Sequence, residues 1–297
     1  FYRSLAEDYL AMPVHTGLKS ESEKFAGAEF TYCIEAMMRD KRALQAGTSH
    51  NLGQNFAKAF DVKFQTKDNV EEYVYATSWG VSTRLIGALI MVHGDDKGLR
   101  LPPKIAPIQI VIVPIFKSDD DLEQLAQYVK PILEYMNENN ISCYFDQRDK
   151  LSPGFKFNEW EMKGVPLRIE VGMRDLNNQV LTIARRDNNA KSTIKINESN
   201  TFLITTLDDI QESLFNEALA FKKDNTFQTS DYDEFKKMIS NGGFVECGWD
   251  GNDETESKIK KETNATIRCI PLEQKHNLKC IYTQKPAKYN VVFAKAY

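Results

Sequence analysis

The sequence predicts a protein of mixed α/β and α+β class, and three observations lead to this prediction. Residues 1–101 alternate helical patterns with strand-like stretches rich in Gly, Thr, Ser and aromatic side chains, as in antiparallel sheet with helices. Ile108–Phe116 is an almost continuous apolar run, typical of a strand covered on both faces. A helical pattern over Asp119–Glu134 and a short strand over Ile141–Phe145 then complete the order of a parallel α/β unit.

Length and composition limit the class further. A chain of 297 residues and 34.0 kDa fits two or three domains, and its 42% hydrophobic and 27% charged residues indicate a soluble globular protein. The longest nearly apolar run, Ile105–Phe116, is well short of the roughly 20 residues that cross a bilayer. The net charge of −4 excludes a purely electrostatic nucleic-acid binder. The 5 cysteines are scattered without a CxxC pair, which favours a reducing, cytoplasmic location.

Local patterns predict the remaining elements of the first segment. The chain opens in a helical pattern over residues 1–10. Thr77–His93 has the pattern of a strand that turns into an apolar helix, with Ser82 or Thr83 as its N-terminal cap. This helix is expected to bury Leu85, Leu89 and Val92.

Two stretches indicate domain boundaries. Pro102-Pro103 ends the first segment, and the polar stretch Asn197–Thr201 is expected to be a linker. The predicted domains therefore span residues 1–101, 102–201 and 202–297. The other predicted elements are strands at Arg168–Val171 and Gln179–Ala184 and helices at Leu207–Lys223 and Tyr232–Ile239.

Few patterns in the sequence carry chemistry. The chain contains no GxGxxG after a strand, no GxxxxGK[ST] and no HExxH, which argues against dinucleotide-binding, P-loop and zinc-protease classes. Ser49 and His50 are neighbours, and neighbours on a strand point to opposite faces, which argues against a hydrolase pair. Thr48 and His50 share a face that can bind a small polar ligand, although a plain polar sheet edge has the same composition. Arg84, at the start of the apolar helix, suits a phosphate, an aromatic ring or a surface salt bridge.

Five stretches of the sequence carry a family resemblance. They are Lys24–Gly27 (KFAG), Gln45–Phe56 (QAGTSHNLGQNF), Ser78–Pro103 (SWGVSTRLIGALIMVHGDDKGLRLPP), Ser152–Gly172 (SPGFKFNEWEMKGVPLRIEVG) and Phe293–Tyr297 (FAKAY). The whole chain resembles the C-terminal portion of a class II prolyl-tRNA synthetase of the eukaryote/archaeal-like type. The resemblance implies the C-terminal part of an antiparallel-sheet catalytic domain in residues 1–101, an α/β anticodon-binding domain with a mixed sheet in 102–201, and a small α+β domain in 202–297.

The resemblance also implies roles for residues of the first domain. Arg84 matches the arginine of class II motif 3, which grips the ATP phosphates, and it is the expected catalytic residue because a rigid guanidinium suits charge that develops on a phosphate. ATP contacts are also implied for Gln45 and Thr48. Phe25 and Trp79 are expected to form an aromatic wall for the pyrrolidine ring of proline. The implied prolyl pocket is completed by His50, Ser78 and Gly80.

In the second domain, the matching positions for reading the two guanines of a proline anticodon are Glu161, Arg168 and Arg174. Arginine can donate to guanine O6 and N7, and glutamate can accept from the N1 and N2 edge of an unstacked base. Without the resemblance, a surface ion-pair network would be the better interpretation of these residues.

The third domain departs from the family pattern. Many relatives hold zinc there through four cysteines, and the matching positions in this chain are Asp250, Thr255, Cys280 and Tyr282. One thiol with oxygen donors makes a poor structural zinc site, so no zinc is expected. Tyr297 is implied to reach back toward the active site.

The function implied by the resemblance is that of a proline-tRNA ligase. Such an enzyme joins proline to ATP as an adenylate, with Mg²⁺ bridging the phosphates, transfers proline to tRNA(Pro), and works as a homodimer. Motifs 1 and 2 and a cis-editing insertion are not found in the chain, so we expect the C-terminal portion of a full synthetase that does not form the adenylate by itself. The alternative is a synthetase-derived tRNA-binding or regulatory module without catalysis.

Overall fold

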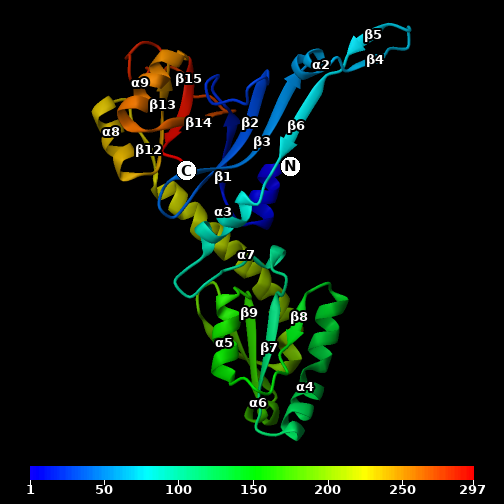
Figure 1. Ribbon diagram of the computed structural model, residues 1–297. Helices are drawn as coiled ribbons and strands as arrows, with labels where there is room; N and C mark the ends of the chain where they lie inside the picture. The colour runs from blue at the N-terminus through cyan, green and yellow to red at the C-terminus, as the bar shows by residue number, and fades with distance from the viewer. The chain divides into compact units, whose positions relative to one another are not determined.

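A computed structural model describes all 297 residues of the chain (Figure 1). The chain packs into two compact units. Unit 1 contains Phe1–Glu7, Met12–Val92 and Leu219–Tyr297, and unit 2 contains Asp8–Ala11 and His93–Ala218. No helix is both long enough and apolar enough to span a membrane.

Unit 1 is built on one eight-stranded sheet with the strand order β12-β13-β15-β14-β1-β2-β3-β6. The β12–β13 pair is parallel, and the other pairs are antiparallel. The antiparallel sheet expected for the first segment is therefore confirmed. The strands are β1 (Val14–Leu18), β2 (Phe30–Met37), β3 (Ala43–Gly53), β6 (Ala76–Gly80), β12 (Thr226–Gln228), β13 (Phe244–Trp249), β14 (Thr266–Pro271) and β15 (Tyr289–Ala294).

The joint between β1 and β14 makes this sheet continuous across the predicted first and third domains. Gly17 of β1 lies opposite Pro271 of β14. A Cβ atom on Gly17 would lie 2.3 Å from the backbone oxygen of Ile270, so only glycine allows the two strands to approach this closely. The two predicted domains thus share one sheet, and the three-domain division stays a prediction.

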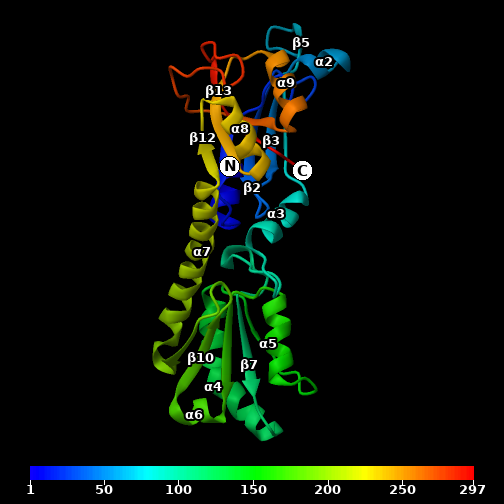
Figure 2. The same cartoon turned by 90° about the vertical axis from the view of Figure 1, so that its left-hand side faces the viewer.

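Helices and a hairpin complete unit 1 (Figures 1 and 2). Helices α8 and α9 cover the part of the sheet formed by the last strands, where Phe235, Ile239 and Ile259 pack on Val245 and Phe293. The β4–β5 hairpin projects beyond the ends of β3 and β6 (Figure 1). These elements are α1 (Tyr2–Ser4), η1 (Leu5–Tyr9), α2 (Asn55–Ala59), β4 (Lys63–Gln65), β5 (Glu71–Tyr73), α3 (Arg84–His93), α8 (Tyr232–Asn241) and α9 (Asp253–Thr263).

Unit 2 has a mixed five-stranded sheet with the order β11-β10-β9-β7-β8, as the sequence predicted for its middle segment. Strand β7 is parallel to β8 and β9, whereas β10 is antiparallel to β9 and β11. The elements are η2 (Pro103–Ile105), β7 (Ile110–Ile115), α4 (Asp119–Glu138), β8 (Cys143–Phe145), α5 (Pro153–Met162), β9 (Leu167–Gly172), α6 (Met173–Asn178), β10 (Val180–Arg185), β11 (Lys191–Lys195) and η3 (Ile196–Glu198).

The alternation along β7 explains why its sequence is apolar throughout. Ile110 and Ile112 are fully buried in one core, together with residues of α4 and of α7 (Ser199–Asp224). Val111 and Val113 are buried in a second core with Trp160 of α5. Helices therefore cover both faces of this sheet, so a strand at its centre carries no polar face.

One prediction about this region is wrong. The stretch 197–201, expected as a polar linker, belongs to η3 and to the first turn of α7, and α7 runs through the predicted 201/202 boundary. The hydroxyl of Ser199 donates to the carbonyl of Ile196, and Leu203, one turn further on, is fully buried. Packing of the apolar side of α7 thus outweighs the loop-like composition of its first residues.

A buried ion cluster joins β1, β2 and β14 in unit 1. Lys19 Nζ donates to Glu35 Oε1 at 2.7 Å, and Arg268 donates to both oxygens of Glu35 at 3.0 to 3.2 Å. The side chains of Lys19, Glu35 and Arg268 are at most 8% exposed. Because removal of one partner would leave a buried charge uncompensated, this cluster fixes how the three strands meet.

The four positions matched to zinc ligands make other contacts. Asp250 Oδ2 accepts from the hydroxyl of Thr255 at 3.1 Å and from that of Thr283 at 3.2 Å. The hydroxyl of Tyr282 donates to Glu262, and Cys280 is fully buried. This set of donors is a poor fit to the thiolate and imidazole ligands that zinc prefers.

We predict that the purified protein carries no stoichiometric zinc. Because hydrogen bonds and apolar packing occupy the matched positions, treatment with EDTA should leave the thermal midpoint unchanged. Elemental analysis with and without EDTA checks this, and zinc at one ion per chain would contradict it.

A second prediction concerns His15 on β1. Its ring packs edge-on against Phe244, its Nε2 has no hydrogen-bond partner, and burial with the nearby Lys222 lowers its pKa from 6.5 to about 3. Between pH 6.5 and pH 3, His15 is therefore protonated in the unfolded chain but neutral in the native protein. The free energy of unfolding should accordingly decrease as the pH falls from 6.5 toward 3. His15→Leu should reduce the drop in thermal midpoint between pH 7 and pH 5, and an unchanged drop would refute this assignment.

Candidate functional site

Four of the predicted pocket residues lie on one face of the sheet in unit 1. Thr48 of β3 pairs with Gly80 of β6, and His50 pairs with Ser78. Side chains two residues apart on a strand, and those directly opposite on its neighbour, share a face. The expectation that Thr48 and His50 share a face is confirmed, and Ser49 lies on the other face, opposite Trp79.

A β-bulge brings Gln45 to the same face. Thr48 lies opposite Cys33 of β2, and Gln45 lies opposite Glu35. Gln45 and Thr48 are three positions apart on β3, whereas Cys33 and Glu35 are two positions apart on β2. The extra residue in β3 shifts the alternation, so Gln45 faces the same side as Thr48 despite their odd spacing. The structure thus brings together the two residues expected to contact ATP.

The imidazole of His50 is the best-defined group on this face. Its Nδ1 lies 2.9 Å from the hydroxyl of Thr31, and its ring lies 4.9 Å from the ring of Phe25. The amide of Phe25 also contacts the Thr31 hydroxyl, at 3.4 Å. Burial lowers the pKa of His50, so its imidazole is neutral at pH 7 and offers one donor and one acceptor.

The expected aromatic wall of Phe25 and Trp79 is not formed. Trp79 lies opposite Ser49, on the face away from His50, and its ring meets the ring of Tyr2 at 6.4 Å. Phe25 instead packs on His50 and lies 6.2 Å from the ring of Phe56. The alternation of side chains along β6 separates Trp79 from its neighbour Ser78, so the two cannot line one pocket from the same face.

Arg84 begins helix α3, as expected. Its backbone amide donates to the hydroxyl of Ser82 at 3.3 Å, and its guanidinium donates to the backbone carbonyl of Gln45 at 3.5 Å. Arg84 forms no salt bridge and is exposed, whereas Leu89 and Val92 are buried and Leu85 is half-buried. A cation beside β3 is therefore available to a ligand.

The C-terminal Tyr297 docks near the same strand. Its hydroxyl donates to Asp40, its ring lies 5.2 Å from the guanidinium carbon of Arg42, and its burial beside Asp40 raises the pKa of its hydroxyl to about 12. The preceding residue, Ala296, pairs with Ala43, two residues before Gln45. The end of the chain is thus held at the β2–β3 turn.

No group of three or more His, Cys, Asp or Glu side chains in the structure could hold a metal ion. Magnesium usually binds through one or two carboxylates together with substrate phosphates.

Unit 2 contains a separate polar pocket. Two of the residues expected to read the anticodon, Glu161 and Arg168, line it. Lys97 Nζ donates to Glu161 at 3.0 Å, and Arg168 donates to Glu170 at 2.9 Å and lies over the ring of Phe157 at 4.5 Å. The other lining residues are Lys97, Trp160, Val165, Ala184, Arg185, Arg186, Asn189 and Lys191.

Arg174 is not part of this pocket. Arg168 stands near the beginning of β9, whereas Arg174 follows the end of that strand, in the first turn of α6. Its side chain is exposed and forms no ion pair. Six residues of extended chain would place the two arginines about 20 Å apart, so a ligand that touches both must be long.

Sequence reasoning missed several residues at both sites. Thr31 holds His50, and alternation along Phe30–Met37 is a signal that could have placed it on the same face as Cys33. Lys191 of β11 donates to Glu170 of β9 at 2.8 Å, across the intervening strand β10. Only the register of these three strands reveals this contact.

Family models match two parts of the chain. The model described as anticodon binding domain matches residues 109–206, and the model described as prolyl-tRNA synthetase, C-terminal, matches residues 232–297. The first range contains the unit 2 sheet, and the second contains β13, β14 and β15 of unit 1.

Curated relatives match the chain from end to end. Proteins named proline–tRNA ligase are 54% identical in Cytophaga hutchinsonii, 52% in Flavobacterium psychrophilum and 53% in Chlorobaculum tepidum, each over 100% of this chain. The chain spans 61%, 61% and 63% of the lengths of these relatives. With both family models and these identities in agreement, the chain belongs to the prolyl-tRNA synthetase family of aminoacyl-tRNA synthetases.

Proposed function

We propose that this chain supplies the motif 3 part of the active site and the anticodon-reading part of a proline-tRNA ligase. The reaction joins proline and ATP to prolyl-adenylate with release of pyrophosphate, and a terminal ribose hydroxyl of tRNA(Pro) then attacks the acyl carbonyl. The observation that carries the proposal is the single face on which Gln45, Thr48, His50 and Ser78 meet, beside the exposed guanidinium of Arg84.

The chemistry asked of these residues is positioning and stabilisation of charge. Arg84 would bind the phosphates of ATP, where a rigid donor fork matches the charge that builds up as pyrophosphate leaves. Thr48 and Gln45 would hydrogen-bond the nucleotide, and Mg²⁺ would enter as part of the ATP substrate. The ring of Phe25 and the neutral imidazole of His50, 4.9 Å apart, would hold the pyrrolidine ring.

For tRNA, we propose that Glu161 and Arg168 read guanine edges in the unit 2 pocket and that the exposed Arg174 binds farther along the anticodon loop. The complete protein is proposed to act in the cytoplasm as a homodimer. Support for tRNA binding comes from the anticodon-binding family model over residues 109–206.

The role of Arg84 can be tested in the complete gene product. Arg84→Ala should lower kcat/KM for proline-dependent pyrophosphate exchange by about 10²- to 10³-fold, as expected for loss of a preorganised charge-stabilising donor. The kcat/KM of Arg84→Lys should lie between those of the wild type and Arg84→Ala, because lysine keeps the positive charge but lacks the planar pair of N–H donors. Lys58→Ala, on α2, is the matched control and should equal the wild type. Exchange that survives Arg84→Ala would refute the assignment, and anticodon binding without exchange by the wild type would favour a non-catalytic module.

The anticodon assignment makes a separate prediction. Arg168→Ala should weaken tRNA(Pro) binding by about 10- to 100-fold, the value of one bidentate base contact, and should relax discrimination against adenine at one anticodon guanine. Pyrophosphate exchange needs no tRNA and should not change. Binding assays with wild-type and adenine-substituted transcripts, with Lys150→Ala as the control, measure this; equal loss for both transcripts would indicate phosphate binding instead.

A further inference from the structure

The β1–β2 loop, residues 19–29, determines where Phe25 lies. Phe25 is 48% exposed, and its contacts are with the rings of His50 and Phe56 and, through its amide, with the Thr31 hydroxyl. The loop leaves β1 at Lys19, whose amide donates to the carbonyl of Thr31 at 2.9 Å. Anything that fixes residues 20–24 therefore also fixes the ring that faces the proposed amino-acid pocket.

A buried carboxylate from helix α9 holds the start of this loop. The hydroxyl of Ser20 donates to Glu256 Oε1 at 3.0 Å, and the two residues are 1% and 3% exposed. The second oxygen, Oε2, is buried and has no hydrogen-bond partner. A buried carboxylate held only by neutral serine hydroxyls, those of Ser20 and Ser22, is costly, and an aliphatic side chain would fill the same space more favourably if packing were its only task.

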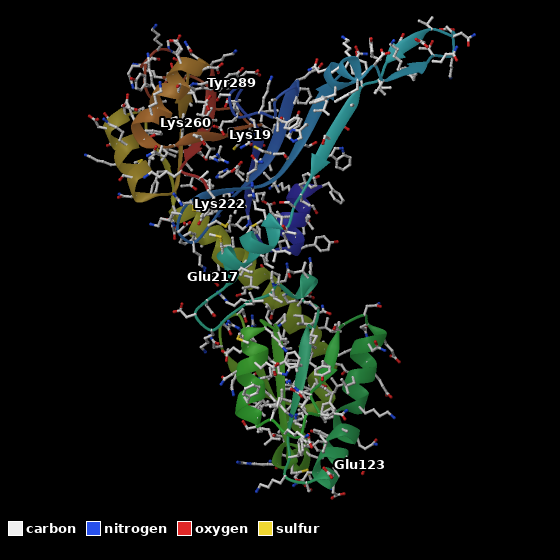
Figure 3. The ribbon with its side chains drawn as sticks, in the orientation of Figure 1. Lys19, Glu123, Glu217, Lys222, Lys260 and Tyr289 are labelled. Carbon is white, nitrogen blue, oxygen red and sulfur yellow. The ribbon has the colours of Figure 1, made fainter.

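Two basic side chains hold the next part of the loop. Lys260, one turn after Glu256 on α9, donates to Glu23 Oε1 at 3.2 Å. Arg268 of β14 approaches Glu23 Oε2 at 4.0 Å while it also holds Glu35. Figure 3 labels Lys260 on α9 and Lys19 at the beginning of the loop.

We propose that Glu256, supported by Lys260, is a positioning residue for the amino-acid pocket. Both residues come from the last 50 or so residues of the chain, touch no substrate, and act by holding the loop so that Phe25 packs on His50. This inference rests on the proposed function, because the pocket in question is the proposed proline pocket.

The test separates the pocket from the rest of the enzyme. In the complete gene product, Glu256→Ala should raise KM for proline by about three- to tenfold, since a smaller fraction of molecules would hold the loop in place, and should leave KM for ATP and kcat nearly unchanged. Glu256→Gln keeps the carbonyl oxygen that accepts from Ser20, so it should restore KM for proline. Lys260→Ala should raise it less, because its ion pair is exposed. Lys258→Ala, the same change on the solvent side of α9, is the matched control.

A second readout needs no activity. Trypsin should cleave after Lys24 faster in Glu256→Ala than in the wild type or in Lys258→Ala. Without the contact to Glu256, the loop of residues 19–29 should adopt the extended conformation that fits the protease active site more often. If Glu256→Ala does not fold, as judged by its thermal transition, the comparison of Lys260→Ala with Lys258→Ala replaces it in both assays.

The possible failures are distinguishable. A wild type without proline-dependent exchange overturns the proposed function, and the cleavage rates then decide whether the loop is anchored. A wild type with normal exchange, together with an unchanged KM for proline in Glu256→Ala, overturns the positioning role. Equal effects on the KM values for proline and ATP would also overturn it, because a general structural role predicts such a result.

Discussion

Glu35 is the carboxylate on which the organisation of unit 1 depends. It binds Lys19 and Arg268 at the point where β14, from the last part of the chain, joins β1 and β2. Loss of Glu35 would leave the buried Lys19 without a carboxylate and Arg268 with only Glu23, at 4.0 Å, and an uncompensated charge in the protein interior costs several kcal/mol. The glycine at position 17 and this ion cluster together explain why strands from opposite ends of the sequence form one sheet.

The same strand connects the ion cluster with the proposed pocket. Thr31, which binds His50, and Glu35 lie on one face of β2, four residues apart, a separation of about 14 Å at 3.4 Å per residue. The C-terminal segment therefore contributes to the pocket in two ways, through the sheet and through the 19–29 loop. A pocket that recognises a small ring by shape depends on such rigidity, because one displaced wall weakens its contacts with the ring.

The sequence indicated those features that depend on local pattern. The apolar run of β7, the shared face of Thr48 and His50 and the start of α3 at Arg84 all follow from periodicity. Pairing between distant segments could not be predicted in this way, so the β1–β14 joint and the shift that brings Gln45 beside Thr48 emerged only from the register. The position of Trp79, in contrast, could have been predicted from the sequence. The alternation of side chains that places Ser49 and His50 on opposite faces also places Ser78 and Trp79 on opposite faces, but the family resemblance led us to expect both in one pocket.

Charge pairing in unit 2 bears on how a nucleic acid would be read there. Arg168 donates through Nε and Nη2 to Glu170 and through Nη1 to the carbonyl of Phe157. A guanidinium has five N–H groups, so about two remain for a ligand, which is the number that guanine O6 and N7 accept. Glu170 accepts from both Arg168 and Lys191, so one carboxylate only partly offsets the two cations. A base edge with two acceptors in the right plane would complete the hydrogen bonding of the arginine, which a single phosphate oxygen cannot do. The fixed orientation of the guanidinium, rather than its charge, is therefore what favours selective reading of a base.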